Sequence, residues 1–275
     1  MKKKNVYFLL VPGIVLILFF LLIPIISTIL PTFFEQKSFT FKTYYKFLSD
    51  DYFMSILLRT LKIGIITTLI CVFVGTPTAY FVSQSSNKIK NVLLICTVFP
   101  LLTNSVVRSF AWITMLGKNG ILNKALVAFQ IFKEPHKFLY TEGAVITGCV
   151  YLFLPLMIVS MVGVMGNIED DLMGAAESLG ANKITAFLKV VLPLSIPGMI
   201  VGSILVFTGT FTAYTTPQLL GGNSNTVMST FIYQKVMTLS DWNSASVIST
   251  IMIVITLFVV FIMNKLASVF YKRGV

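Results

Sequence analysis

The sequence predicts an all-α integral membrane protein with six transmembrane helices. Of its 275 residues, 56% are apolar and 11% are charged, and the mean hydropathy is +0.89. An ordinary globular domain has roughly 25% charged residues, so this composition argues against a soluble enzyme and places the chain in the membrane class. The second observation is a series of long apolar runs, because a helix needs about 20 such residues to cross a bilayer.

Six such runs follow one another along the chain. We expect spans at Val6 to Leu30, Ile63 to Val82, Val92 to Trp112, Gly143 to Met165, Pro197 to Tyr214 and Ala245 to Phe270. The first run is too long for the apolar core of a secretory signal and lacks a small-residue cleavage site, so we expect it to be retained as a span. The third is less regular than the second, because Arg108 falls inside it.

The last three runs also contain residues that are unusual in helices. Pro155 lies inside the fourth run, where neighbouring helices can satisfy the carbonyl group that a proline frees. The fifth run is short and holds three glycines, Gly198, Gly202 and Gly209, while the sixth continues almost to the C-terminus. None of the six runs contains an Asp, a Glu or a His.

Basic residues near the ends of the spans indicate how the chain is oriented. The formal net charge is +11, from 21 Lys and Arg against 10 Asp and Glu. In a membrane protein such an excess serves mainly to set orientation, and short segments beside span ends carry the most weight. The short clusters are Lys2 to Lys4, Lys88, Lys90, Lys272 and Arg273. We therefore expect both termini in the cytoplasm, and no nucleic acid as a partner, because no basic stripe is interleaved with aromatics.

The most patterned connection is Gly166 to Ile196, between the fourth and fifth spans. Acceptors suited to a helix N-terminus come first, at Asn167, Asp170 and Asp171. An apolar stripe at helical spacing follows, at Leu172, Ala176 and Leu179. Gly180 is expected to end this short helix, since glycine readily takes the positive φ of a C-terminal cap.

A second amphipathic helix is expected directly after the first. Its apolar positions are Ile184, Phe187, Leu188 and Val191. Pro193 and Pro197 then end this helix and begin the fifth span. Pattern alone leaves two interpretations open: the helix pair fits the groove of another protein, or it rests on the bilayer surface.

The same loop resembles the cytoplasmic signature loop of permease subunits of ABC importers. That signature is Glu-Ala-Ala, three residues, Gly, nine residues, then Ile-x-Leu-Pro. The matching residues are Ala175, Ala176, Gly180, Val190, Leu192 and Pro193. Gly174 departs from the pattern, because the family commonly has Glu there, so an ion pair made by that Glu would have to come from a neighbouring acid.

Two further stretches are similar to the spermidine/putrescine-type, PotB-like branch of these permeases. They are Val106 to Asn123 and Phe211 to Gly222, the latter followed by Asp241 and Trp242. The resemblance covers nearly the whole chain. It implies a type I ABC importer permease fold, with residues 1–56 as the first helix and an extracytoplasmic loop, 57–270 as the permease domain with its coupling loop 166–196, and 271–275 as a cytoplasmic tail.

The resemblance also implies a set of partners. The chain has no phosphate-binding GxxxxGK[ST] loop, so two separate ATPase subunits are expected, together with a second permease subunit, an extracytoplasmic solute-binding protein and membrane lipid. No cofactor is expected. The residues expected to couple to the ATPase are Asp171, Leu172, Gly174, Ala175, Ala176, Leu179 and Gly180.

Polar residues in the spans are the first candidates for a substrate path, because they are costly at membrane depth unless they serve a function. Aromatic residues near them are added as candidates. We select Arg108, Trp112, Tyr151, Phe211, Tyr214, Thr216, Gln218, Asp241 and Trp242. The aromatic rings can face an ammonium group, and Asp241 with Glu142 can attract it at the outer mouth. The alternatives are that Arg108 extends to the interface and that the aromatic residues anchor or pack helices.

The expected function is therefore the permease subunit of an ABC importer, with spermidine or putrescine as the substrate. The alternatives are another small solute, such as an aminophosphonate, an opine or ferric ion, and a membrane-embedded enzyme. An enzyme is disfavoured because no nucleophile, base and orienting residue come together in the sequence. The three cysteines and the single His136 are widely separated, so no metal site is expected.

Overall fold

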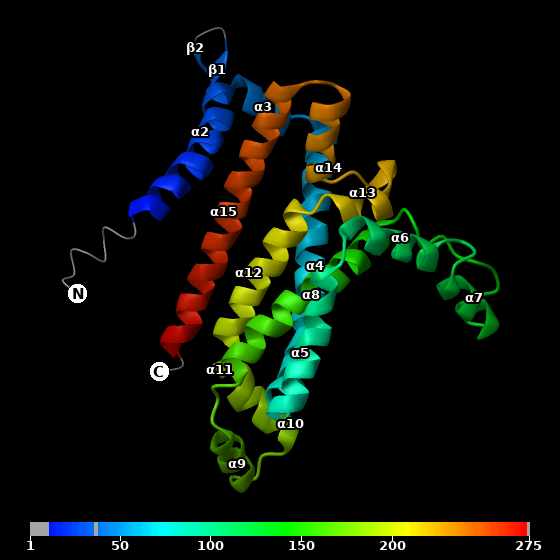
Figure 1. Ribbon diagram of the computed structural model, residues 1–275, viewed down its shortest axis with the longest axis vertical. Coiled ribbons are helices and arrows are strands. Elements are labelled where there is room, and N and C mark those ends of the chain that lie inside the picture. Colours follow the sequence, from blue (N-terminus) through cyan, green and yellow to red (C-terminus); the bar gives the residue numbers. More distant parts are fainter. Residues whose placement is uncertain (1–10, 36–37, 274–275) are drawn as a thin grey trace. The chain divides into compact units, whose positions relative to one another are not determined.

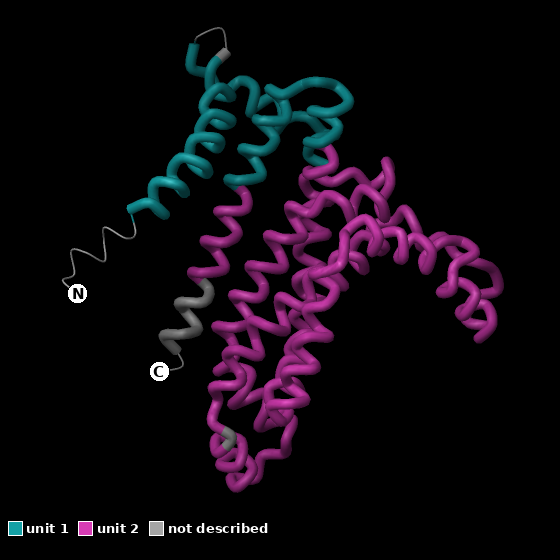
Figure 2. The backbone as a smooth tube through the Cα atoms, in the orientation of Figure 1, with its two compact units in different colours: residues 1–55, 232–254 teal, residues 56–231, 255–275 magenta. Residues whose placement is uncertain are grey.

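The structure, a computed structural model, describes residues 11–35 and 38–273, apart from the side chains of residues 35, 170 and 266–273. Lys2 to Lys4, the start of the first expected span, and the side chains of Lys272 and Arg273 lie outside the described residues. The described residues are helical apart from connections and one small hairpin (Figure 1). The chain divides into two compact units, residues 1–55 with 232–254 and residues 56–231 with 255–275 (Figure 2).

Four continuous helices are long and apolar enough to cross a membrane: Val11–Phe33, Asp51–Ser83, Glu142–Met165 and Trp242–Lys265. Two further pairs are bent, Asn87–Leu102 with Ser105–Ala128 by 94° and Lys183–Leu194 with Ile196–Thr212 by 68°. The described part of the chain thus holds four such helices, or up to six spans if each bent pair counts as one.

The first unit contains the first span, the first residues of the helix Asp51–Ser83 and the start of the last helix. Its elements are η1 (Leu18–Leu22), α2 (Ile23–Ile29), η2 (Leu30–Phe33), β1 (Phe34–Glu35), β2 (Ser38–Phe39), α3 (Lys42–Leu48), η5 (Gln234–Thr238) and the beginning of α15 (Trp242–Arg273). The strands are antiparallel, with Phe34 opposite Phe39. Asp241 begins α15, because its Oδ1 accepts a hydrogen bond from the Ser244 amide at 3.0 Å.

The second unit contains the remaining helices, together with the end of α15 and without the last two residues of α14. They are most of α4 (Asp51–Ser83), then α5 (Asn87–Leu102), α6 (Ser105–Leu116), α7 (Ile121–Ala128), α8 (Glu142–Met165), α9 (Asp170–Ser178), α10 (Lys183–Ala186), η3 (Phe187–Val191), α11 (Leu192–Leu194), α12 (Ile196–Thr212), α13 (Thr215–Gly221), η4 (Asn223–Asn225) and α14 (Met228–Tyr233). A core of fully buried residues joins α4, α8 and α12, and it includes Cys71, Ala79, Met157, Met161 and Val206.

The glycines of the fifth expected span have a packing role. An added Cβ at Gly202 would collide with Ser160 and Met157 of α8, and one at Gly209 would collide with the Phe153 ring. Close approach of two helices requires such small residues where their backbones meet. The short, glycine-rich run is therefore α12, packed directly on α8.

The expectation of one continuous third span is wrong, because the helix breaks between α5 and α6. Asn104 begins α6, since its Oδ1 accepts hydrogen bonds from the amides of Val106 at 2.8 Å and Val107 at 3.4 Å. An apolar run alone does not reveal that the helix direction changes by 94° at this point.

The second span begins earlier than expected, at Asp51 instead of Ile63. Asp50 caps it, because its Oδ1 accepts a hydrogen bond from the Phe53 amide at 2.7 Å. Arg59 and Lys62 interrupt the apolar pattern without ending the helix, and both pair with Glu142.

Candidate functional site

The helix pair of the loop 166–196 is present as α9 and α10, at the lower end of the second unit in Figure 1. Asp171 lies in the first turn of α9, next to the helix N-terminus. Asn167 does not cap this helix. It ends α8 instead, because its Nδ2 donates to the Gly163 carbonyl oxygen at 3.0 Å. The side chain of Asp170 lies outside the described residues.

Gly180 ends α9 with a φ of +88°, as the sequence predicts. The Gly180 amide donates to the Glu177 carbonyl oxygen at 2.9 Å, and the Ala181 amide donates to that of Ala176 at 3.0 Å. This pair of hydrogen bonds is a Schellman motif, which requires a residue with positive φ after the helix. Asn182 begins α10 at once, since its Oδ1 accepts from the Thr185 amide at 2.8 Å. The two helices are therefore separated by a short connection that is capped on both sides.

The loop has one face in the core and another that the chain leaves exposed. Met173 and Phe187 pack against the core of α4 and α8, and the Phe187 ring lies 4.9 Å from that of Tyr80. On the exposed face, Leu179 is 89% exposed and Ile184 is 72% exposed. Both residues belong to the loop between α8 and α12, where exposed apolar side chains are available for contact with another protein or with the bilayer surface.

Gly174 lies in the middle of α9 with open space around it. An added Cβ would meet no atom within 4 Å. A Glu at this position, as in the signature of the family, therefore has room in this chain. Because this space is open, nothing in the packing requires glycine here. Glycine in a helix interior also costs about 1 kcal/mol relative to alanine.

Arg108, a candidate for the substrate path, is bound at the break between α5 and α6. Its side chain is buried, with 8% of the residue exposed. Its Nη1 donates to the Pro100 carbonyl oxygen at 2.7 Å and lies 3.4 Å from both the carbonyl and the hydroxyl oxygen of Thr103. The last carbonyls of a helix lack partners within it, so the guanidinium satisfies the end of α5. Arg108 thus does not extend to solvent.

Several of the other path candidates come together in the second unit. The Trp112 and Tyr151 rings meet edge to face at 5.6 Å, which joins α6 to α8. Thr216 is buried where α13 meets α8, and an added Cβ at Gly148 would collide with it. Gln218 and Tyr214 are partly exposed at the same short helix, and the Gln218 amide donates to the Tyr214 carbonyl oxygen at 3.0 Å.

The remaining candidates lie elsewhere. Phe211 is fully buried and stacks on Phe207 at 5.5 Å. Asp241 and Trp242 belong to the first unit, where Trp242 is 66% exposed. Hydrogen bonding from Ser244, and then the charge of Lys235 at 3.8 Å, hold the pKa of Asp241 below its ordinary value.

Glu142 is occupied by two cations of α4. Its Oε1 accepts from Arg59 Nε at 3.2 Å, and its Oε2 accepts from Lys62 Nζ at 2.8 Å. Arg59 also donates from Nη1 to the Thr226 carbonyl oxygen at 3.2 Å, so the cluster joins α4, α8 and the segment before α14. This cluster was not predicted from the sequence, although opposite charges at neighbouring span ends are a usable signal for it. Its geometry fits a structural clamp better than a free carboxylate that attracts substrate.

Asn123 is a second functional residue that was not predicted from the sequence. It is 1% exposed, and its amide Nδ2 donates to the carbonyl oxygens of Gly117 at 3.1 Å and His136 at 2.9 Å. Its Oδ1 accepts from the His136 amide at 2.9 Å. Asn123 therefore holds the connection around α7 in shape, and a lone Asn in the sequence gives no hint of this.

Comparison with known proteins supplies the context for these sites. Residues 73–273 match the family described as "Binding-protein-dependent transport system inner membrane component". The spermidine/putrescine transport system permease protein PotB of Haemophilus influenzae is 32% identical over 261 residues, which cover 92% of this chain and 91% of the relative. PotB of Escherichia coli is 31% identical over 209 residues, 76% of each chain.

A solved structure shares the fold. The crystal structure of a bacterial ABC transporter involved in the import of the acidic polysaccharide alginate contains a chain that superposes with a TM-score of 0.80. The superposition covers 97% of this chain and 96% of that one, at 18% sequence identity. At this identity the likeness shows the fold alone.

Proposed function

Because this chain belongs to the family of binding-protein-dependent transport system inner membrane components, it is a membrane permease subunit of an ABC importer, and we propose that it forms half of the path for a polyamine, spermidine or putrescine. The observation that supports this choice of substrate is the match to PotB over 92% of this chain. The enzyme alternative is set aside, since the relatives are permease proteins.

The proposed mechanism couples ATP hydrolysis on a separate subunit to movement of the spans. The exposed Leu179 and Ile184 would contact the ATPase, while Met173 and Phe187 connect the same loop to the core of α4 and α8. A displacement of α9 would thereby reach the spans. The proposed coupling residues remain Asp171, Leu172, Gly174, Ala175, Ala176, Leu179 and Gly180.

The proposed assembly holds two ATPase subunits, a second and different permease subunit, and an extracytoplasmic binding protein. The description of the family supports the binding protein, and the absence of a phosphate-binding loop supports the separate ATPase. We propose six spans with both termini in the cytoplasm, counting each bent pair as one span. The division into residues 1–56, 57–270 and 271–275 is proposed on the same basis.

Within the path we propose different roles for the selected residues. Trp112 and Tyr151 present partly exposed rings that can face an ammonium group, and Thr216 and Gln218 lie on the neighbouring α13. Arg108 would act as a positioning residue that holds the break between α5 and α6, because its guanidinium is bound to α5.

Uptake of radiolabelled spermidine by the reconstituted complex with its binding protein tests the substrate. We expect saturable, ATP-dependent uptake that excess unlabelled putrescine inhibits, and no effect of excess ferric ion, opine or aminophosphonate. If excess polyamine does not reduce the uptake, the proposed polyamine substrate is wrong. A complex that neither assembles with an ATPase nor responds to any solute would contradict the proposed coupling as well.

A further inference from the structure

The end of the first span carries a cluster of aromatic side chains, which we name the aromatic hairpin: Phe33, Phe34, Phe39, Phe41 and Tyr44. Neighbouring ring centroids in this cluster lie 5.1 to 6.4 Å apart. Despite these contacts, Phe34, Phe39 and Phe41 remain 50%, 62% and 59% exposed. The cluster is therefore ordered by its own stacking and still presents apolar surface outward.

The end of the first apolar run places the aromatic hairpin at the edge of the bilayer. That run, Val6 to Leu30, is expected to span the membrane, and it ends three residues before Phe33. The residues that follow Phe33 thus lie where the acyl region meets the lipid headgroups, the level at which aromatic side chains are enriched.

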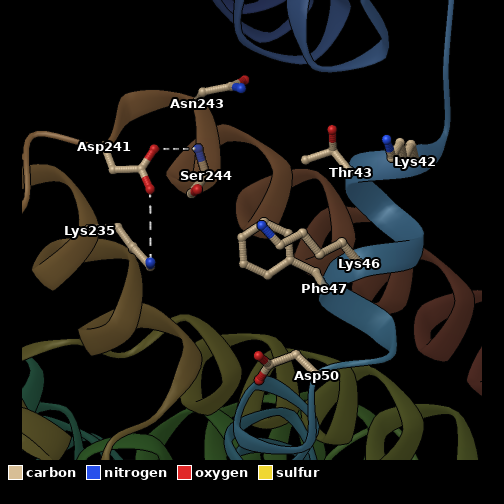
Figure 3. A pocket seen from close by; sticks show the side chains of 9 residues that line it. All are labelled: Lys42, Thr43, Lys46, Phe47, Asp50, Lys235, Asp241, Asn243 and Ser244. Carbon is tan, nitrogen blue, oxygen red and sulfur yellow. Dashed lines mark hydrogen bonds and ion pairs between the residues drawn. The ribbon is translucent and has the colours of Figure 1, made fainter. Parts of the chain in front are cut away.

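A polar cavity of about 560 Å³ lies in the same unit (Figure 3). It is lined by Lys42, Thr43, Lys46, Phe47, Asp50, Lys235, Asp241, Asn243 and Ser244. Helix α3 joins the two features, because Tyr44 belongs to the aromatic hairpin while Lys42 and Lys46, four residues apart, face the cavity. In Figure 3, Lys46 extends from α3 toward the side that Asp241 and Ser244 line.

The cavity has an excess of positive charge. Its lining contains three ammonium groups and two carboxylates, a surplus of one positive charge. Both carboxylates are already engaged, since Asp50 caps α4 and Asp241 caps α15 and faces Lys235. Lys42 and Lys46 form no ion pair within the described part of the chain. A ligand with a single negative charge would balance this surplus.

We propose that this cavity binds the phosphate of an anionic membrane lipid, with the aromatic hairpin at the boundary of its acyl chains. The lipid belongs to the leaflet opposite the N-terminus. Lys42 and Lys46 would contact the phosphate oxygens, and the hydroxyls of Thr43 and Ser244 offer further donors. This site depends only on embedding in the membrane, so it stands or falls separately from the proposed substrate.

Native mass spectrometry of the full-length chain tests the site, with phosphatidylglycerol and phosphatidylcholine added in turn. We expect preferential retention of phosphatidylglycerol, because the choline group of the other lipid is repelled by lysine. The double variant Lys42→Gln/Lys46→Gln should lower this retention roughly tenfold or more. Lys118→Gln/Lys124→Gln removes the same charge from two exposed residues outside the cavity and should leave retention unchanged.

A second measurement follows the aromatic hairpin. Cys96 is the exposed native cysteine, so it is first replaced by Ser. A polarity-sensitive fluorophore is then attached to Phe39→Cys, and the labelled protein is placed in nanodiscs. We expect quenching by brominated acyl chains and weak quenching by iodide from the water.

Four outcomes would overturn the proposal. The first is that the two double lysine variants lose phosphatidylglycerol equally, and the second is that excess inorganic phosphate displaces phosphatidylglycerol from the wild-type chain. The third is that only iodide quenches the label at residue 39. The fourth is that the cavity lysine variant weakens attachment of the binding protein but not retention of lipid. The second would assign the cavity to free phosphate, and the fourth would assign it to a protein partner.

Discussion

Gly174, inside α9, and Gly180, which ends this helix, should respond in opposite directions to the same substitution. Gly174 and Gly180 are six positions apart, and an added Cβ at either one would meet no atom within 4 Å. Steric crowding therefore contributes nothing at either site, and only the backbone decides the outcome. Gly174 is in the helix interior, whereas Gly180 has a φ of +88°.

The magnitudes follow from these conformations. Gly174→Ala should stabilise α9 by about 1 kcal/mol, the usual difference between glycine and alanine within a helix. Gly180→Ala should destabilise the connection by about 1–2 kcal/mol, the cost of a Cβ in the left-handed region. Gly180→Asn should cost less than Gly180→Ala, because Asn adopts positive φ more readily than other non-glycine residues.

Hydrogen exchange of the α9 amides in the purified chain measures the local effect, and substrate-stimulated ATP hydrolysis by the complex measures the functional one. A destabilisation of about 1–2 kcal/mol raises the population of the opened loop roughly 5- to 30-fold. We expect faster exchange and lower coupling for Gly180→Ala, and slower exchange for Gly174→Ala. If both alanine variants shift exchange in the same direction, the capping argument is wrong. If Gly180→Ala opens the loop but transport keeps its normal rate, the proposed role of α9 in coupling is wrong.

Three further predictions concern the loop, the charge clamp and the cap of α15. Leu179→Ser should leave the thermal unfolding midpoint of the chain unchanged, because the residue is 89% exposed, but should weaken co-purification with the ATPase; retention of the ATPase at the wild-type level would contradict this. Glu142→Gln should destabilise the chain by about 1 kcal/mol, as for partly exposed ion pairs, and Lys62→Gln by less, with chemical denaturation as the measurement. Asp241 has a lowered pKa, so its cap stabilises the fold above the ordinary pKa of 3.8 and loses this effect only as the pH falls through the lower folded value. The difference in unfolding midpoint between wild type and Asp241→Asn should therefore be constant near neutral pH and disappear in strong acid, and a difference that changes near neutral pH would refute the assignment.

Hydropathy and local caps predicted a large part of this fold. The spans ending at Met165 and Thr212 match their apolar runs closely, and Gly180 ends α9 as expected. These features depend on neighbouring residues, so a single sequence is sufficient to infer them. The loop 166–196 could likewise be found from residue spacing.

The features that were missed depend on direction or on distant partners. The break at Asn104 lies inside an apolar run, and hydropathy does not change when a helix turns. The charged residues in the early part of α4 pair with Glu142, which is 83 positions from Arg59 and 80 from Lys62. Only the fold brings such residues together, so no local pattern could indicate that the Glu142 carboxylate forms ion pairs with Arg59 and Lys62.

The glycine contacts between α8 and α12 have a mechanical consequence. At Gly198, Gly202 and Gly209, side chains of α8 fill the space that a Cβ would occupy. Two helices interlocked in this way cannot slide or separate by small steps, because each step would first create voids along the whole contact. We expect α8 and α12 to move together as one rigid body. The bends beside Asn104 and Ser195 are then the expected hinges within the second unit.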